Sequence, residues 1–228
     1  MIKDEKIDKE LQGKGVKFLP FVGDQYWYGI SFNDNGELVL GTEAKPGKKV
    51  LVLGESHYCD DDWKDEELYT FTRDVLDCYL DSEERYSWMR TFVKFERALD
   101  PKESKYSKNI WSHLMFYTYL QKPLYSIRMI GTQGDYEEAV ELFNKVLEQY
   151  KPDCIMVWGR RLYNNLPTKD IKCFDLSSDI EIMEYNFEGY EVLVMPMQHP
   201  SGVFFSCSFW YENVVELFKK YLYGTDKS

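Results

Sequence analysis

The sequence predicts an α/β protein with three layers, in which a central, mainly parallel four-stranded sheet is covered by helices on both faces. Short aliphatic runs, typical of buried parallel strands, alternate along the chain with amphipathic helical patterns. The length of 228 residues suits one large domain, and a 44% share of apolar residues can fill its core. No internal repeat or low-complexity linker divides the chain, so a single domain over 1–228 is expected.

Residues 1–47 are expected to form an N-terminal extension that carries a β-hairpin, ahead of an α/β core at 48–222. Two β-rich runs, Tyr26–Phe32 and Glu37–Gly41, flank the Asn-Asp-Asn-Gly sequence at 33–36. Residues of these types tolerate a left-handed backbone, so this sequence favours a tight turn between the two strands.

The α/β core is predicted from its strand and helix patterns in chain order. The strands expected in the central sheet are Val50–Leu53, Leu114–Leu120, Cys154–Trp158 and Glu191–Met197, and Asp179–Phe187 is a candidate for one more. The helices are expected over about Leu68–Leu80, Tyr86–Leu99, Asp135–Tyr150, Arg160–Leu166 and Trp210–Leu222. Because the first and third strands are apolar at every position, helices are expected above and below the sheet.

Charge and hydropathy limit the function classes. A net charge of −11 argues against a protein that coats nucleic acid without selectivity, because phosphate binding depends mostly on Lys and Arg. A local basic groove stays compatible with this total. The charged N-terminus lacks the apolar segment of a signal peptide, and no apolar run approaches the roughly 20 residues of a membrane span. A cytoplasmic protein without a membrane partner is therefore expected.

The five cysteines indicate neither a disulfide framework nor a metal site. Their number is odd, and no two of them form a CxxC pair. We expect reduced, mostly buried thiols and no bound metal or other cofactor. The acidic run Asp60–Asp62 is interpreted as a solvated charge cluster at the start of a helix.

Two short polar segments follow predicted parallel strands and are the candidates for a functional site. Gly-Glu-Ser-His-Tyr at 54–58 follows the first strand, and His-Pro-Ser-Gly at 199–202 follows the last. In open α/β sheets, ligands bind beyond the carboxyl ends of the strands. Both segments are therefore expected to line one cleft, onto which His57 and His199 open. The competing interpretation is a pair of polar turns with hydrogen-bonded histidines.

On these residues the chain resembles the uracil-DNA glycosylase superfamily, over about residues 48–218. In that family one strand ends in a water-activating loop reading GQDPYH, or a variant such as GEAPG, to which residues 54–59 are similar. A late strand ends in HPSPL followed by paired phenylalanines, to which residues 199–205 (HPSGVFF) are similar. Between them the family has a Lys-Pro break and an apolar strand closing on Trp-Gly, as at 151–159.

The resemblance implies hydrolysis of the N-glycosidic bond of a uracil or modified base flipped out of DNA. His199 matches the family's donor to the leaving base. Ser201 matches a hydroxyl that grips a phosphate, and Gly202 would let the backbone approach the DNA. Val203 matches an apolar wedge that fills the vacated base stack. The implied partner is DNA with a damaged or modified base, bound by a monomer.

Ser56 and Glu55 complete the catalytic residues that the resemblance implies, with one departure. The most active relatives carry Asp where this chain has Ser56. A hydroxyl can orient water but is a poor general base at neutral pH, so weak activity is expected. Glu55 or His57 could substitute for the missing acid. No cysteine precedes Cys59, so no iron–sulfur cluster is expected.

The base pocket implied by the resemblance is lined by Tyr58 and His57, with Thr118 and Tyr117 from the second strand. Tyr58 matches the family's tyrosine that walls the pocket at the place where the methyl group of thymine would lie. The family's Asn, which pairs with the uracil edge, is absent from residues 114–119. Thr118 or Tyr117 would then read the base, and a hydroxyl separates uracil from cytosine less sharply than an amide does. A modified base or another nucleobase is therefore compatible with the sequence.

Two other functions compete with base excision. In an esterase, Gly54-Glu55-Ser56 would stand in for a nucleophile loop, but Pro196 occupies the position of the Asp that should precede the late histidine by three residues. In the second alternative, the chain is a catalytically impaired nucleic-acid- or nucleotide-binding module on the same scaffold. Ser56, the missing Asn and the acidic net charge all agree with this hypothesis of a binding module.

Overall fold

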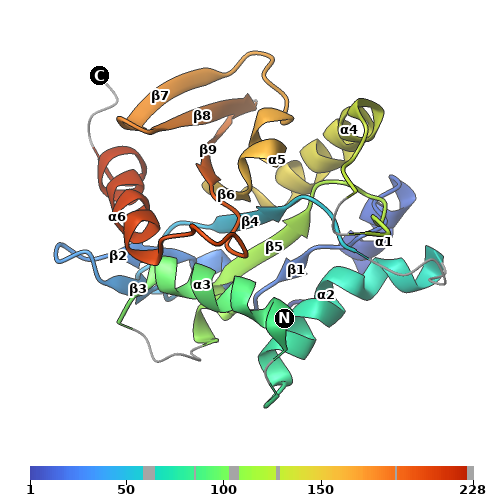
Figure 1. Cartoon of the computed structure of the whole chain (residues 1–228), viewed down its shortest axis with the longest axis horizontal. Helices are drawn as coiled ribbons and strands as arrows, with labels where there is room; N and C mark the ends of the chain where they lie inside the picture. The colour runs from blue at the N-terminus through green and yellow to red at the C-terminus, as the bar shows by residue number, and fades with distance from the viewer. Residues whose placement is uncertain (59–64, 85, 103–107, 127–128, 188, 225–228) are drawn as a thin grey trace.

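A seven-stranded, mostly parallel sheet in the order β1-β5-β4-β6-β9-β8-β7 forms the centre of the protein (Figure 1). The computed structural model describes residues 1–58, 65–84, 86–102, 108–126, 129–187 and 189–224. The strands are β1 (Phe21–Val22), β4 (Val50–Gly54), β5 (Leu114–Thr118), β6 (Cys154–Trp158), β7 (Lys172–Ser177), β8 (Ile180–Phe187) and β9 (Tyr190–Met197). The acidic run at 60–62 lies outside the described residues.

The four strands predicted for the centre of the sheet are present, and β5, β4, β6 and β9 run parallel to one another. The predicted total of four strands is wrong, because three more strands, β1, β8 and β7, extend the sheet through antiparallel pairings. β8 confirms the candidate strand within Asp179–Phe187. β1 has only two residues and β7 is exposed at half of its positions, so neither has a pattern that the sequence makes visible.

The N-terminal hairpin is shorter than predicted. Its strands are β2 (Ile30–Phe32) and β3 (Leu38–Leu40), which pair in a separate two-stranded sheet. The preceding residues form the 3₁₀ turn η1 (Tyr26–Tyr28) instead of a strand. Gly29 follows this turn at φ +59°, and an added Cβ there would lie 2.3 Å from the Lys48 carbonyl oxygen. Residues 1–47, predicted as an extension with a hairpin, also contribute the strand β1 to the main sheet.

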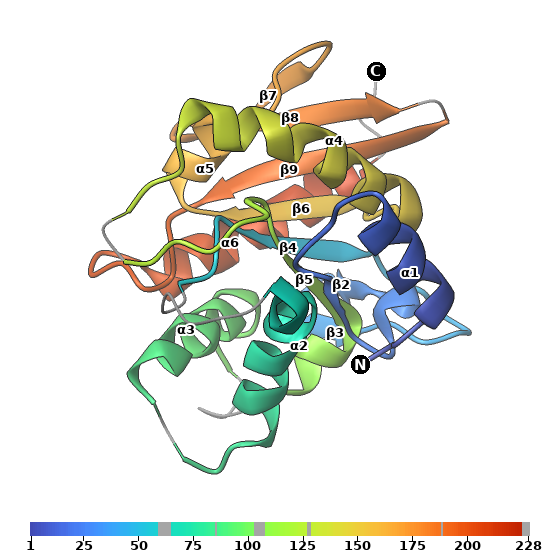
Figure 2. The same ribbon diagram turned by 90° about the vertical axis from the view of Figure 1, so that its right-hand side faces the viewer.

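Helices cover both faces of the sheet, as predicted (Figure 2). They are α1 (Glu5–Gly13), α2 (Asp65–Asp81), α3 (Arg90–Leu99), α4 (Gln133–Tyr150), α5 (Arg160–Asn164) and α6 (Cys207–Leu217), with 3₁₀ turns η2 (Ser87–Met89) and η3 (Asn109–His113) and a π-helical turn η4 (Phe218–Leu222). One face packs against α3, α6 and much of α2, and the other packs against α1, α4 and α5.

Alternation along the central strands sends side chains into these two cores in turn. Val50 and Val52 join the core under α3 and α6, whereas Leu51 and Leu53 join the core under α4. Each of these four side chains is fully buried, which explains the unbroken aliphatic run in the sequence.

The cysteines are less buried than the sequence predicts. Of the four described, only Cys154 is buried, while Cys207 is half-buried and Cys78 and Cys173 are exposed. All four are free thiols. Cys78 lies on α2 and Cys173 on β7, a strand that is exposed at half of its positions.

Candidate functional site

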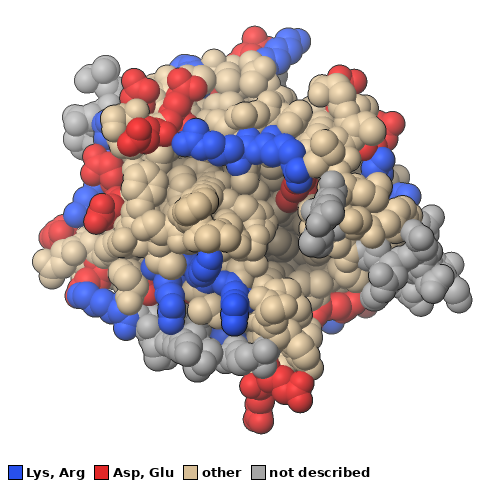
Figure 3. Space-filling view, viewed as in Figure 1, with Lys and Arg blue, Asp and Glu red and all other residues tan. Residues whose placement is uncertain are grey.

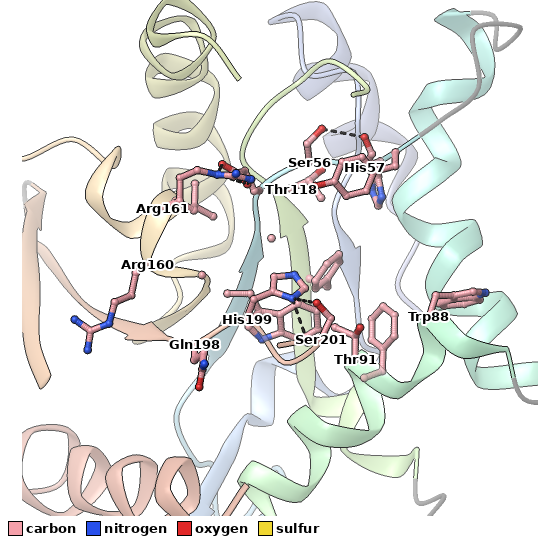
Figure 4. Close-up of a pocket in the computed structure, with 18 of the residues that line it drawn as sticks. Ser56, His57, Trp88, Thr91, Thr118, Arg160, Arg161, Gln198, His199 and Ser201 are labelled. Atoms are coloured by element: carbon pink, nitrogen blue, oxygen red, sulfur yellow. Dashed lines mark hydrogen bonds and ion pairs between the residues drawn. The ribbon is translucent and has the colours of Figure 1, made fainter. Parts of the chain in front are cut away.

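A cavity of about 980 Å³ opens where β4, β5, β6 and β9 end (Figure 4). Its walls come from the loop after β4, the end of β5, the β6–α5 junction, the loop after β9, and the starts of α3 and α6. The structure therefore brings the two polar segments at 54–58 and 199–202 to one site. The cause is the parallel topology, which places the carboxyl ends of these strands at the same edge.

Residues 55–57, at the start of the loop after β4, are hydrogen-bonded to the chain that follows β5. The amide of Leu124 donates to the His57 carbonyl at 2.9 Å, and the amide of Leu120 donates to the Glu55 carbonyl at 2.8 Å. Ser56 Oγ lies 2.9 Å from the carbonyl oxygen of Lys122 and 3.0 Å from that of His57. The hydroxyl hydrogen of Ser56 thus fastens the loop, and this serine is not placed as a water-activating base.

His57 borders the cavity, but its ring is anchored in the protein interior. Its Nε2 lies 2.8 Å from Thr72 Oγ1, and Phe18 and Phe71 pack edge-to-face against it with centroids at 5.1 and 4.7 Å. Burial lowers the pKa of His57 to about 3. A neutral imidazole with these partners holds the loop to α2.

Replacement of His57 by Gln should make the free energy of unfolding depend less on pH in the mildly acidic range. The pKa of His57 is about 6.5 in the unfolded chain but about 3 in the folded protein. The unfolded chain therefore binds the proton first as the pH falls, and the free energy of unfolding decreases below about pH 6.5. At about pH 5 this loss amounts to about 2 kcal/mol. Urea unfolding of both proteins at neutral and acidic pH measures it, and parallel pH curves would contradict the assignment.

Glu55 is held by two donors from separate elements. Arg161, in the first turn of α5, donates from Nε to Glu55 Oε1 at 2.8 Å and also from Nη2 to Oε2. The hydroxyl of Tyr136 on α4 donates to Oε1. The hydrogen bond to Glu55 raises the pKa of Arg161. With both oxygens engaged, Glu55 brings negative charge to the cavity but is a poorly available proton acceptor.

The ring of His199 lies in the middle of the residues that line the cavity (Figure 4). The amide of Ser201 donates to Nδ1 at 3.2 Å, and Ser201 Oγ lies 2.7 Å from the same atom. Because an amide can only donate, Nδ1 carries the lone pair and the neutral ring carries its proton on Nε2. Burial lowers the pKa of His199, which favours this neutral form. Nε2–H is therefore a donor available to a ligand.

The end of β5 presents alternate side chains to the cavity. Phe116 and Thr118 line it, together with Trp158 from β6. Tyr117 points to the opposite face, into the core under α4, so its prediction as a pocket residue is wrong. In the described part of the chain, the buried atoms Thr118 Oγ1 and Trp158 Nε1 have no hydrogen-bond partner. Such atoms cost free energy unless a ligand or water completes them.

The loop after β9 divides its residues between the cavity and the surface. Ser201 lines the cavity and orients His199. Gly202 lies outside the lining, its carbonyl accepts from Lys94 Nζ at 2.9 Å, and an added Cβ would lie 3.0 Å from the His199 carbonyl oxygen. Val203 and Phe204 point to solvent and are 89% and 87% exposed. Neither of the two reaches the cavity.

Several residues that shape the cavity were not predicted as site residues. They are Arg161, Trp158, Phe116, Trp88, Thr91, Gln198 and Phe209. Arg161 had a usable signal, because it directly follows a strand that ends at the same sheet edge as 54–58. Trp88 and Phe209 come from helices distant in sequence, and only packing brings them to the opening.

No protein-family model matches the chain, and no curated protein matches it. Among the described residues, no three His, Cys, Asp or Glu side chains gather in a way that could hold a metal ion. No described helix is both long and apolar enough to cross a membrane.

Proposed function

We propose that the protein receives a single base, flipped out of DNA, in this cavity and slowly hydrolyses its N-glycosidic bond. The observation that carries the proposal is the state of His199, a neutral ring with Nδ1 occupied and Nε2–H free to donate. As the bond breaks, the base gains negative charge and the sugar becomes an oxocarbenium-like cation. A donor aimed at the base stabilises that charge where it develops.

The walls of the cavity suit a flat, polar-edged ligand. Phe116 and Trp158 border the cavity with small areas of aromatic ring, since they are 5% and 3% exposed. Two of the lining residues also carry buried polar atoms, Thr118 Oγ1 and Trp158 Nε1, that have no hydrogen-bond partner in the described part of the chain. The hydroxyl of Thr118 can donate or accept, whereas the indole N–H can only donate. Uracil or a modified base that offers acceptor atoms on its edge fits this set.

The water-activating side of the site explains why we expect slow turnover. Glu55 is the only carboxylate among the described residues that line the cavity, and Arg161 and Tyr136 engage both of its oxygens. Its charge can stabilise the sugar cation and orient water, but it removes a proton poorly. Water adds its oxygen to the sugar C1′ and gives its proton to the departing base.

A panel of DNA oligonucleotides, each with one uracil or modified base, tests the proposal. After incubation with an excess of protein, abasic sites are revealed by alkaline strand cleavage. We expect cleavage at one or a few of the bases. The absence of abasic sites across the whole panel would refute the proposed chemistry.

The second candidate function is binding without catalysis. The hydrogen bonds that occupy Ser56 and Glu55 favour it, because they leave no free general base among the described residues of the cavity. The same panel decides between the two functions. Specific binding of a base-containing oligonucleotide without any strand cleavage would establish a binding module.

A further inference from the structure

Exposed aromatic rings surround the mouth of the cavity. Tyr58, Trp88 and Phe209 line it and are 44%, 39% and 37% exposed. Behind Trp88 lies Phe92, edge-to-face with centroids 5.8 Å apart, and behind Phe209 lies Trp210 at 5.1 Å. These two rings are thus anchored from the interior and open to solvent. Exposed apolar surface with a polar surround marks a binding surface in a soluble protein.

Basic side chains flank this rim on two sides. Arg90, Lys94 and Arg97 recur at helical spacing on one side of α3, where Lys94 Nζ also binds the Gly202 carbonyl at 2.9 Å. Arg160 begins α5 across the cavity, next to Arg161, whose guanidinium is paired with Glu55. Figure 3 shows Lys and Arg gathered over α3 and near α5, with the hollowed face between them. In a chain of net charge −11, this concentration makes one face locally favourable for phosphates.

We infer that this face binds single-stranded DNA, with the bases next to the flipped one stacked on the rim rings and the phosphates held by the basic flanks. The inference rests on the proposed function of the cavity and adds the form of the nucleic acid. Aromatic rings can stack on any unpaired base, whereas a duplex covers its base faces with neighbouring bases. A duplex also concentrates phosphates on both strands, which an acidic protein accommodates poorly.

Fluorescence anisotropy with a labelled DNA of about 15 nucleotides measures this directly, using the full chain. The probe is offered as a single strand, as a duplex with its complement, and as RNA of the same sequence. We expect the single DNA strand to bind at least about tenfold more tightly than the duplex. Trp88→Ala should weaken binding of the strand by about tenfold or more, because one stacked base is lost. Trp88→Phe keeps a ring and should retain most of the affinity.

Trp27 provides the matched control. It is 47% exposed, but it lies at the amino end of β4, where Lys49 sits over its ring. Trp27→Ala should leave binding unchanged. Arg90→Ala should weaken binding and lower the dependence of log affinity on log salt by about one.

Tighter binding of the duplex or of the RNA, or equal binding by Trp88→Ala and wild type, would overturn the inference. Excision from duplex alone would overturn it while leaving the proposed chemistry intact. Tight, Trp88-dependent binding of the single strand without excision of any base would support it while refuting that chemistry.

Discussion

His199→Ala is expected to lower the rate of base excision by about a hundredfold or more. The variant loses the Nε2–H donor at the point where the departing base becomes negative. It also frees the Ser201 amide, which otherwise holds the ring at 3.2 Å. Single-turnover cleavage of whichever oligonucleotide the wild type attacks gives the rate, and circular dichroism verifies that the variant folds.

Ser56→Ala is the matched comparison for His199→Ala. Its hydroxyl lies within hydrogen-bond distance of the backbone carbonyls of His57 and of Lys122 in the chain after β5, so its loss removes about one hydrogen bond from the scaffold. We therefore expect only a small reduction in rate. If Ser56→Ala were as inactive as His199→Ala, water activation by the serine would have to replace our account. Wild-type activity in His199→Ala would remove the observation on which the proposed function depends.

Asp8→Ala is expected to lower the free energy of unfolding by about 3–5 kcal/mol, the largest stability effect that we predict. Arg73 on α2 is 5% exposed at its side chain and donates to both Asp8 oxygens, at 2.6 and 2.7 Å. Its Nε also donates to the Pro20 carbonyl at 3.0 Å. Removal of Asp8 leaves a buried guanidinium without its carboxylate, which costs far more than the pair itself contributes.

Urea unfolding at neutral pH measures this loss, and Glu5→Ala is its control. Glu5 lies on the same helix and pairs with Lys9 at 3.6 Å, but both side chains are largely exposed. Exposed pairs contribute little, so Glu5→Ala should unfold at nearly the same urea concentration as the wild type. Equal effects of the two substitutions would show that the Asp8–Arg73 pair does not hold α1 and α2 together.

Hydropathy along the chain is enough to predict the parallel centre of the sheet and the edge at which the two polar segments meet. Val50–Leu53 and Cys154–Trp158 are aliphatic or aromatic at every position because both of their faces are covered, so local composition already encodes their burial. The segments that follow such strands must meet at one edge of a parallel sheet, whatever packs around them. For that reason the sequence predicts that His199 and residues 54–58 lie close together.

The contacts that each of those side chains makes depend on the three-dimensional packing. His57 turns to Thr72 and two phenylalanines, Glu55 pairs with Arg161, and Tyr117 faces the core under α4. Strand register decides which way Tyr117 points. Contacts between residues far apart in the chain decide the partners of His57 and Glu55. The pairing of β1 and β7 is decided in the same way. Hydropathy patterns record whether a position is buried, but not which distant partner its polar atoms find.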